Sequence, residues 1–446
     1  MEAKEIIKKN WFFVVVFAFL SRIFLINRVK IILWDATVYI MNARWFIGEQ
    51  VFWEILRAPL LPFLISPLTL FGASPKAYVT FSVLISILSI IVTYFVAREF
   101  FGEKAGVLSA LIIAVVPLHI FWSPQVYTEI LGSLFVLGCV YFLWKFDKSE
   151  NNNKFLYLCG LMAGFSFLSR YILGIMLPVI FIFLLLRKKL TIKNGLIILI
   201  FFSIVVIPWF AYNYSIFEDP MHSIREGIRW KGQGVMPYAY YLTELPAAMS
   251  FAFLVVAFGF FYSLKHLKNP KIQLLLITFI TFFVFITIDT HKEIRYFLPM
   301  FPVIIIFSSY FIEKIDFKKF GWIVFAIVAI TGVFTLISVP NTYSSCYGII
   351  EASQDLDGIV ASVYWPQTAY YGNVSVRAMP ADKSELDDFV RRYYISYVLI
   401  SSTPAFPDYA NDFEYFDGLE YLELKKEVED NCQTFRIYKV NKNYFQ

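Results

Sequence analysis

Two acidic residues stand beside apolar segments, where a carboxylate can take part in acid–base chemistry. Asp35 opens the segment 35–44, in which Tyr39 and Arg44 recur at near-helical spacing. A carboxylate can accept the proton of an attacking hydroxyl when it lies within hydrogen-bond reach. We therefore predict that Asp35 is a general base at the start of a short helix. The alternative is that Asp35 only caps this helix, a common role for aspartate.

The second acidic residue is Glu129, which follows Tyr127 and Thr128 where one apolar run ends and the next begins at once. This position predicts a carboxylate at the head of a helix inside a cleft. The alternative is an interfacial carboxylate that the positive end of the helix dipole favours.

The densest polar run between two apolar segments is 291–296, His-Lys-Glu-Ile-Arg-Tyr. Arg295 can hold a phosphate through two parallel donors, and His291 and Lys292 can add positive charge. The alternative is a charged turn that stabilises the start of the next helix. Arg170, which separates two other apolar runs, is either a further phosphate contact or a turn residue that reaches the membrane interface.

The composition places these residues in a membrane protein. Hydrophobic residues make up 59% of the chain and charged residues 16%, whereas a soluble domain carries about 25% charge. The net charge of +5 comes with no basic stripe or nucleic-acid motif, so nucleic-acid binding is excluded. About eleven apolar segments are candidates to span the bilayer. They are 11–27, 77–97, 105–122, 126–144, 155–169, 171–186, 195–212, 245–264, 271–289, 296–312 and 320–339. The apolar stretch 57–71 is too short and too rich in proline for a span, so we expect a surface or tucked helix.

Basic clusters predict the orientation. Lys and Arg gather in every second loop, which places these loops and the N-terminus in the cytoplasm of a multi-pass protein of the cell membrane. The candidate site residues then lie on the extracytoplasmic side, together with residues 341–446.

Residues 341–446 differ in kind from the apolar part, 1–340. The runs 358–363, 397–401 and 434–440 read as strands and 384–392 as a helix, which predicts a small α/β domain. Cys346 and Cys432 could pair if this domain is extracytoplasmic, or remain two thiols, because sequence cannot fix connectivity. No metal-ligand spacing is present, so we expect no metal and no cofactor.

The motifs together resemble a known superfamily. They are Asp35 with Tyr39 and Arg44, 57–62 (Arg-Ala-Pro-Leu-Leu-Pro), Tyr127 with Glu129, Pro208-Trp209 with Asn213, Asp219-Pro220, and the run 291–296. Over residues 10–340 the chain resembles the GT-C glycosyltransferases that use polyprenyl-phosphate sugars, especially the dolichyl-phosphate-mannose protein mannosyltransferase and aminoarabinose transferase superfamily. The run 291–296 is similar to the His-Lys-Glu-x-Arg-Phe signature of mannosyltransferases that extend lipid-linked glycans and GPI precursors, with Tyr296 where Phe is usual.

The resemblance implies an α-helical polytopic fold and an inverting, metal-independent hexosyl transfer, of mannose or another hexose. The partners would be a polyprenyl- or dolichyl-phosphate sugar donor, a glycan, lipid or protein acceptor, and membrane lipids. Asp35 and Glu129 would be catalytic. Donor phosphate would be held by His291, Lys292, Arg295, Arg170 and Arg57, and substrate by Tyr39, Arg44, Tyr127, Glu293 and Tyr296.

Two other functions predict different sequence features. A transporter or flippase of a lipid-linked glycan would place polar residues at mid-membrane and show internal repeats, whereas these residues gather at one surface and no repeat is evident. A non-catalytic scaffold would not need the clustering of Asp35, Glu129 and the run 291–296.

Overall fold

The computed structural model describes residues 3–49, 51–149, 152–229, 236–314, 317–338, 346–404 and 406–445. The chain divides into two compact units. The first comprises Met1–Ile26, Ile55–Leu61 and Val79–Pro340, and the second comprises Asn27–Glu54, Pro62–Tyr78 and Asn341–Gln446. The second unit thus contains the segment that carries Asp35. The predicted domain boundary between residues 340 and 341 lies outside the described residues.

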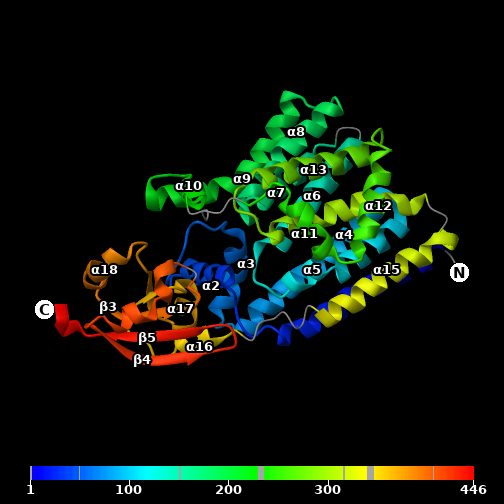
Figure 1. The fold of residues 1–446 in the computed structure, drawn as a ribbon. Helices are drawn as coiled ribbons and strands as arrows, with labels where there is room; N and C mark the ends of the chain where they lie inside the picture. The colour runs from blue at the N-terminus through cyan, green and yellow to red at the C-terminus, as the bar shows by residue number, and fades with distance from the viewer. Residues whose placement is uncertain are drawn as a thin grey trace. The chain divides into compact units, whose positions relative to one another are not determined.

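The first unit is helical (Figure 1). Its elements are α1 (Ala3–Ile23), η1 (Phe24–Asn27, ending in the second unit), α4 (Pro75–Val115, beginning in the second unit), α5 (Pro117–Trp122), α6 (Thr128–Lys148), α7 (Lys154–Ser169), η2 (Tyr171–Ile175), α8 (Met176–Leu186), α9 (Ile192–Phe217), α10 (His222–Arg229), α11 (Tyr240–Met249), α12 (Ala252–Leu264), α13 (Pro270–Ile288), η3 (Ile294–Met300), α14 (Phe301–Ser309), η4 (Tyr310–Glu313) and α15 (Phe317–Ser338). This confirms the predicted polytopic α-helical class.

The predicted spans all fall on helical segments. Among the described residues, 6 helices are long and apolar enough to cross a membrane: Pro75–Val115, Thr128–Lys148, Ile192–Phe217, Pro270–Ile288, Ile294–Ile312 and Gly321–Ser338. The remaining predicted spans coincide with shorter apolar helices or with the second half of α4. The number of spans therefore stays a prediction, while a multi-pass membrane protein is established.

Two local features shape the bundle. In α4 the helix breaks at Phe101 and Gly102, where Gly102 has φ 81° and ψ 178°, a conformation that only glycine adopts readily. This break separates the two predicted spans 77–97 and 105–122. Helices α7 and α9 pack closely because Gly160 and Gly164 of α7 face α9, and an added Cβ at Gly164 would come within 2.7 Å of the Val205 side chain.

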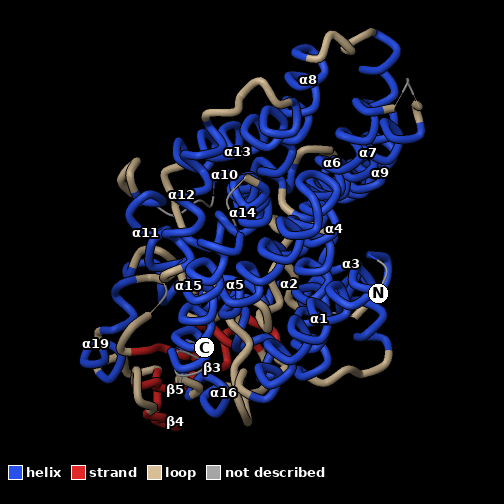
Figure 2. Tube along the Cα trace, turned by 90° about the vertical axis from the view of Figure 1, so that its right-hand side faces the viewer, coloured by secondary structure: helices blue, strands red, loops and turns tan. Residues whose placement is uncertain are grey.

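The second unit contains a five-stranded sheet in the order β2-β1-β3-β5-β4. Figure 2 shows the strands gathered together in red. Its elements are α2 (Trp34–Phe46), α3 (Leu60–Leu70, beginning in the first unit), α16 (Gly348–Ala352), β1 (Ile359–Ser362), α17 (Trp365–Gly372), β2 (Ser375–Ala378), η6 (Lys383–Glu385), α18 (Leu386–Arg392), β3 (Ile395–Ser401), η7 (Asp408–Asn411), α19 (Phe413–Asp417), β4 (Leu422–Glu429), β5 (Thr434–Val440) and η8 (Lys442–Phe445).

The pairing in this sheet is mixed. Strand β1 pairs in parallel with β2 and β3, whereas β5 runs antiparallel to β3 and β4. The three predicted strands correspond to β1, β3 and β5, and the predicted helix to α18, which confirms the small α/β domain. Strands β2 and β4 were not predicted, because they are edge strands in which most side chains are exposed or partly exposed.

The Cys346–Cys432 disulfide staples this domain, with a Cα–Cα distance of 5.5 Å and a sequence separation of 86. The structure thereby decides between the two alternatives that the sequence left open. Cys139 and Cys159 of the first unit are free and buried, with their sulfur atoms 3.5 Å apart.

Candidate active site

Glu129 lies in the first turn of α6, because Tyr127 before it is extended and the helix begins at Thr128. Its side chain is only 2% exposed, and its Oε1 accepts a hydrogen bond from Arg170. Arg295 Nε lies 3.7 Å from the same oxygen. Oε2 is buried and has no hydrogen-bond partner among the described residues. Glu129 therefore shares its negative charge between two arginines and keeps one acceptor oxygen without a hydrogen bond among the described residues.

Both arginines rest on aromatic faces. The Arg295 guanidinium lies over the rings of Tyr127, at 4.6 Å, and Trp122, at 5.3 Å. The Arg170 guanidinium lies 4.1 Å from the ring centroid of Tyr296. Cation–π contacts of this kind stabilise a cation where water is scarce. They hold the two positive charges beside Glu129.

The segment 291–296 completes this cluster. Glu293 Oε1 accepts hydrogen bonds from Arg295 Nη2 at 2.7 Å and from the Tyr296 hydroxyl at 2.9 Å. His291 Nε2 lies 3.3 Å from the same oxygen. The site thus joins the first turn of α6, the N-cap residue of η2 and the segment 291–296, which runs into η3; these are far apart in the sequence.

Lys292 and Arg57 contact other groups. The Lys292 ammonium donates to the carbonyl oxygen of Met236 at 3.1 Å and lies 5.6 Å from the Tyr238 ring. The carbonyl oxygen of Arg57 lies 3.4 Å from the Tyr171 hydroxyl. The Lys292 ammonium is therefore held by a backbone carbonyl and an aromatic face.

Two polar networks outside the predicted site residues position the cluster, and the second contains the Trp209 and Asn213 of the Pro208-Trp209 motif. Arg22 is fully buried and donates to Ser123 Oγ at 3.0 Å and to the carbonyl of Ala114 at 2.5 Å, so it anchors the link between α5 and α6. A charged residue inside an apolar segment was the available signal.

The second network surrounds Tyr171, which follows Arg170. Its hydroxyl accepts from Trp209 Nε1 at 2.9 Å and lies 3.0 Å from Ser223 Oγ. Asn213 accepts from the backbone N–H of Ser223 and donates to the Trp209 carbonyl. These bonds join η2, α9 and α10, and they fix the backbone from which Arg170 projects.

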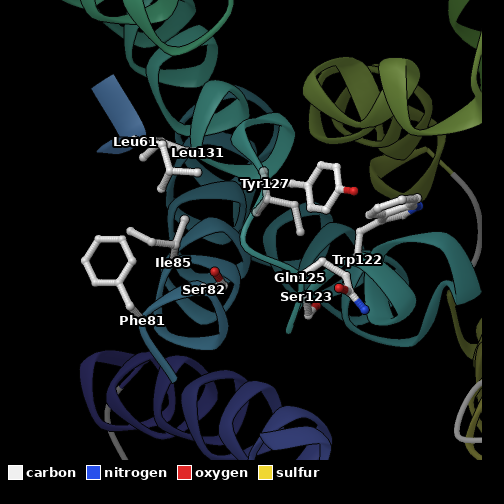
Figure 3. A pocket seen from close by; sticks show the side chains of 10 residues that line it. Leu61, Phe81, Ser82, Ile85, Trp122, Ser123, Gln125, Tyr127 and Leu131 are labelled. Atoms are coloured by element: carbon white, nitrogen blue, oxygen red, sulfur yellow. The ribbon is translucent and has the colours of Figure 1, made fainter. Parts of the chain in front are cut away.

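A narrow pocket adjoins the cluster. Figure 3 shows its lining, with Tyr127 and Trp122 on one side and Leu61 and Phe81 on the other. Ser82, Ser123 and Gln125 add polar groups. Because the rings of Tyr127 and Trp122 also contact the Arg295 guanidinium, the pocket borders the charged cluster.

Asp35 lies in the second unit, in the first turn of α2. Helix α2 begins at Trp34 and its N-cap is Leu33, so Asp35 is not the cap residue that the alternative required. Its side chain is 9% exposed. The preceding Trp34 packs edge-on against Trp365, with ring centroids 4.6 Å apart.

Tyr39 and Arg44 are also in α2 and have structural contacts. Tyr39 is buried. Arg44 pairs with Glu49 at 2.6 Å and donates to Asn373 Oδ1 at 2.9 Å, so it ties α2 to the end of α17. The candidate residues therefore fall into two sets: Asp35, Tyr39 and Arg44 in the second unit, and the remainder in the first.

Solved structures of two membrane proteins have a similar architecture. The structure of ArnT from Cupriavidus metallidurans bound to undecaprenyl phosphate aligns with 98% of this chain and 98% of its own, with a TM-score of 0.73 at 13% identity. The archaeal oligosaccharyltransferase AglB from Archaeoglobus fulgidus, in complex with an inhibitory peptide and a dolichol-phosphate, aligns with 89% of this chain and 69% of its own, with a TM-score of 0.64 at 12% identity. At these identities the likeness concerns the fold.

Two family models match successive parts of the sequence. The family described as dolichyl-phosphate-mannose-protein mannosyltransferase matches residues 57–212, and the Alg9-like mannosyltransferase family matches residues 231–362. The two family matches, together with a fold like those of ArnT and AglB, support the GT-C superfamily of membrane glycosyltransferases for this chain. The second match includes the segment 291–296.

Two curated proteins resemble parts of this chain. An uncharacterized protein of Aquifex aeolicus is 25% identical over 263 residues, which is 56% of this chain and 51% of that protein. GPI mannosyltransferase 3 of Saccharomyces cerevisiae is 28% identical over 130 residues, which is 28% of this chain and 20% of that protein. The chain thus spans about half or less of the curated relatives that it matches.

Proposed function

We propose that this GT-C chain transfers a sugar, mannose or another hexose, from a polyprenyl- or dolichyl-phosphate donor to a hydroxyl of a glycan, lipid or protein acceptor. The observation that carries the proposal is the cluster around Glu129, in which two arginines held on aromatic rings adjoin a carboxylate with one unused oxygen. ArnT, which has a similar fold, binds undecaprenyl phosphate. Both matching family models are of mannosyltransferases.

The proposed reaction is a single displacement. Asp35 accepts the proton of the acceptor hydroxyl, and the oxygen attacks C1 of the donor sugar. The bond between C1 and the phosphate oxygen breaks, and polyprenyl phosphate leaves with the electron pair. Attack on the face opposite the leaving group inverts the configuration at C1. Arg295, Arg170 and His291 stabilise the charge that develops on the phosphate.

Glu129 has a separate role in this proposal. A buried acceptor without a partner costs free energy, which a substrate hydroxyl can relieve by donating to it. Glu129 Oε2 would therefore orient the donor sugar or the acceptor. Because arginines supply the positive charge beside it, the transfer is proposed to need no metal.

The proposed site faces the extracytoplasmic side of the cell membrane, with the N-terminus in the cytoplasm. The support is the charge pattern of the loops, where basic residues gather at the opposite ends of the helices. The domain 341–446, proposed to start near residue 341, would lie on the same side as the site.

The test is transfer of radiolabelled sugar from dolichyl-phosphate-mannose and dolichyl-phosphate-glucose, with EDTA present, to lipid-linked glycan and peptide acceptors. Asp35→Asn is expected to lower turnover by about 10²–10⁴-fold while the protein stays folded. Asp382→Asn is the matched control, since Asp382 is an exposed aspartate of the same unit that caps η6.

The outcomes of this assay distinguish the proposed enzyme from its alternatives and test Asp35 as the base. Transfer that the control retains and Asp35→Asn loses supports the enzyme class and identifies the acceptor. Near-normal turnover in Asp35→Asn removes Asp35 as the base. Absence of transfer from every donor favours a transporter or flippase of a lipid-linked glycan instead.

A further inference from the structure

One carboxylate oxygen in the first unit gathers three hydrogen-bonding groups of a single short segment. Glu293 Oε1 lies 2.7 Å from Arg295 Nη2, 2.9 Å from the Tyr296 hydroxyl and 3.3 Å from His291 Nε2. The arginine and tyrosine donate, and histidine donates when it carries a proton on Nε2. Three donors that converge on one oxygen form an anion site that is already assembled.

This site lies at the open edge of the cluster. The side chains of Glu293 and His291 are 35% and 39% exposed, whereas those of Arg295 and Glu129 are 8% and 2% exposed. An anion that arrives from solvent or from the membrane interface therefore meets Glu293 before it can reach the Arg295 guanidinium.

The carboxylate and a lipid phosphodiester are interchangeable in charge. Arginine binds carboxylates and phosphates through the same donor geometry, and each ligand here carries about one negative charge. Exchange of one for the other leaves the net charge of the cluster unchanged. Glu129, which is buried and held by Arg170, is not comparably placed to leave.

We propose that Glu293 occupies the position of a donor phosphate oxygen and is displaced when the lipid phosphate binds. This inference rests on the proposed function, since it takes the lipid phosphate as the ligand. The carboxylate competes with the donor before the reaction. It also competes with the released polyprenyl phosphate afterwards, and its return favours product release.

A purely structural role predicts the opposite change in affinity. If Glu293 only positioned Arg295 and Tyr296, loss of its charge would leave these donors poorly ordered and weaken phosphate binding. If Glu293 competes, loss of its charge strengthens binding. The sign of the change therefore separates the two roles.

The experiment measures binding of dolichyl-phosphate-mannose, a phosphodiester, and of dolichyl monophosphate, the released form, to the purified full chain in nanodiscs by native mass spectrometry. Glu293→Gln keeps the size of the side chain and removes its charge, so we expect the dissociation constant to fall by about tenfold. Glu99→Gln is the matched control, because Glu99 also pairs with cations but lies elsewhere, just before the break in α4. Its carboxylate is 2.7 Å from the Lys145 ammonium and 3.8 Å from that of Lys148. Its affinity for the lipid phosphate should equal that of the wild type.

A second variant guards against loss of folding. Glu293→Asp keeps the charge but retracts the carboxylate from the three donors, and we expect a smaller gain in affinity. Unchanged or weaker binding in both variants, with clear binding by the wild type, would overturn the role of Glu293 alone. A wild-type protein that binds neither lipid phosphate would overturn the proposed donor, and the inference with it.

Discussion

At the scale of single residues, the two oxygens of Glu129 are in different situations. Oε1 accepts from Arg170 and lies near Arg295, while Oε2 is buried with no partner among the described residues. An ion pair in a buried setting is costly to break from one side, because the remaining charge stays desolvated. Glu129 is therefore expected to contribute both to the stability of the cluster and to the reaction.

The substitution Glu129→Gln tests this expectation. It keeps the shape but removes the charge that Arg170 and Arg295 share, so we expect kcat/KM for transfer to fall on the order of 10²-fold. Steady-state kinetics of Glu129→Gln, Arg170→Gln and the double variant measure the coupling. Because the two residues act together, the double variant should lose much less than the product of the single losses. Multiplicative losses would show that they act independently.

The sequence was sufficient to name most members of the cluster but not their partners. The polar run 291–296 stood out because polar side chains are costly beside apolar helices. Nothing in that run shows that Lys292 contacts Met236 while Glu293 turns to Arg295 and Tyr296. Side-chain pairing depends on the tertiary packing of η3 against α6, which single-sequence patterns do not contain.

At the scale of elements, helix α17 supports the segment that leads into α2. The Tyr371 hydroxyl accepts a hydrogen bond from the backbone N–H of Ile32 at 2.6 Å, and Gln367 Nε2 donates to the Ile32 carbonyl at 3.4 Å. Trp34 packs on Trp365 at the other end of the same helix. The domain formed by residues 341–446, here called the tail domain, thus holds the backbone immediately before Asp35 in place.

The substitution Tyr371→Phe removes one of these supports. An N–H that loses its buried partner costs about 1–3 kcal/mol, so we expect a lower melting temperature. If Asp35 is the base, kcat should also fall while the affinity for the donor is unchanged. Tyr370→Phe is the matched control, because the hydroxyl of Tyr370 makes no hydrogen bond to another described residue.

The pH dependence of the hydrogen bond between Tyr371 and Ile32 follows from the pKa of the Tyr371 hydroxyl. Burial raises the pKa of Tyr371 to about 12, above the usual value of 10.0. A raised pKa favours the neutral hydroxyl in the folded state, so its contribution is fully present below pH 10 and is lost as the pH rises through 12. The stability difference between wild type and Tyr371→Phe should therefore be constant in melting curves from pH 6 to 9. A difference that varied across this range would assign the support to another group.

The elements themselves were predictable to different degrees. Apolar length located the helices, and the break in α4 matches the gap between two predicted spans because Gly102 permits a backbone that other residues resist. Strand β4 was not predicted because its sequence, Leu-Glu-Leu-Lys-Lys-Glu-Val-Glu, is highly charged. An edge strand does not have to be buried on both faces, so its sequence shows only a weak pattern of apolar residues.

At the scale of the whole molecule, the Cys346–Cys432 disulfide bears on which side of the membrane the tail domain occupies. Disulfides persist in oxidising compartments and are rare in the cytosol. The pair closes a long loop, with a separation of 86 residues, and joins the segment before α16 to the turn between β4 and β5. An extracytoplasmic tail and the charge pattern of the loops therefore predict the same orientation by independent routes.

The chain contains its own control for a test of this orientation. Cells that express the protein are treated with a thiol-blocking reagent before lysis, and all four cysteine-containing peptides are analysed by non-reducing mass spectrometry. We expect Cys346 and Cys432 in one cross-linked species and Cys139 and Cys159 as thiols, since the latter are free and buried in the first unit. Cys346→Ser with Cys432→Ser should lower the stability of the domain by about 2–4 kcal/mol. Free thiols at both tail positions would instead argue for a reducing compartment, and the proposed site would then have to face the cytoplasm.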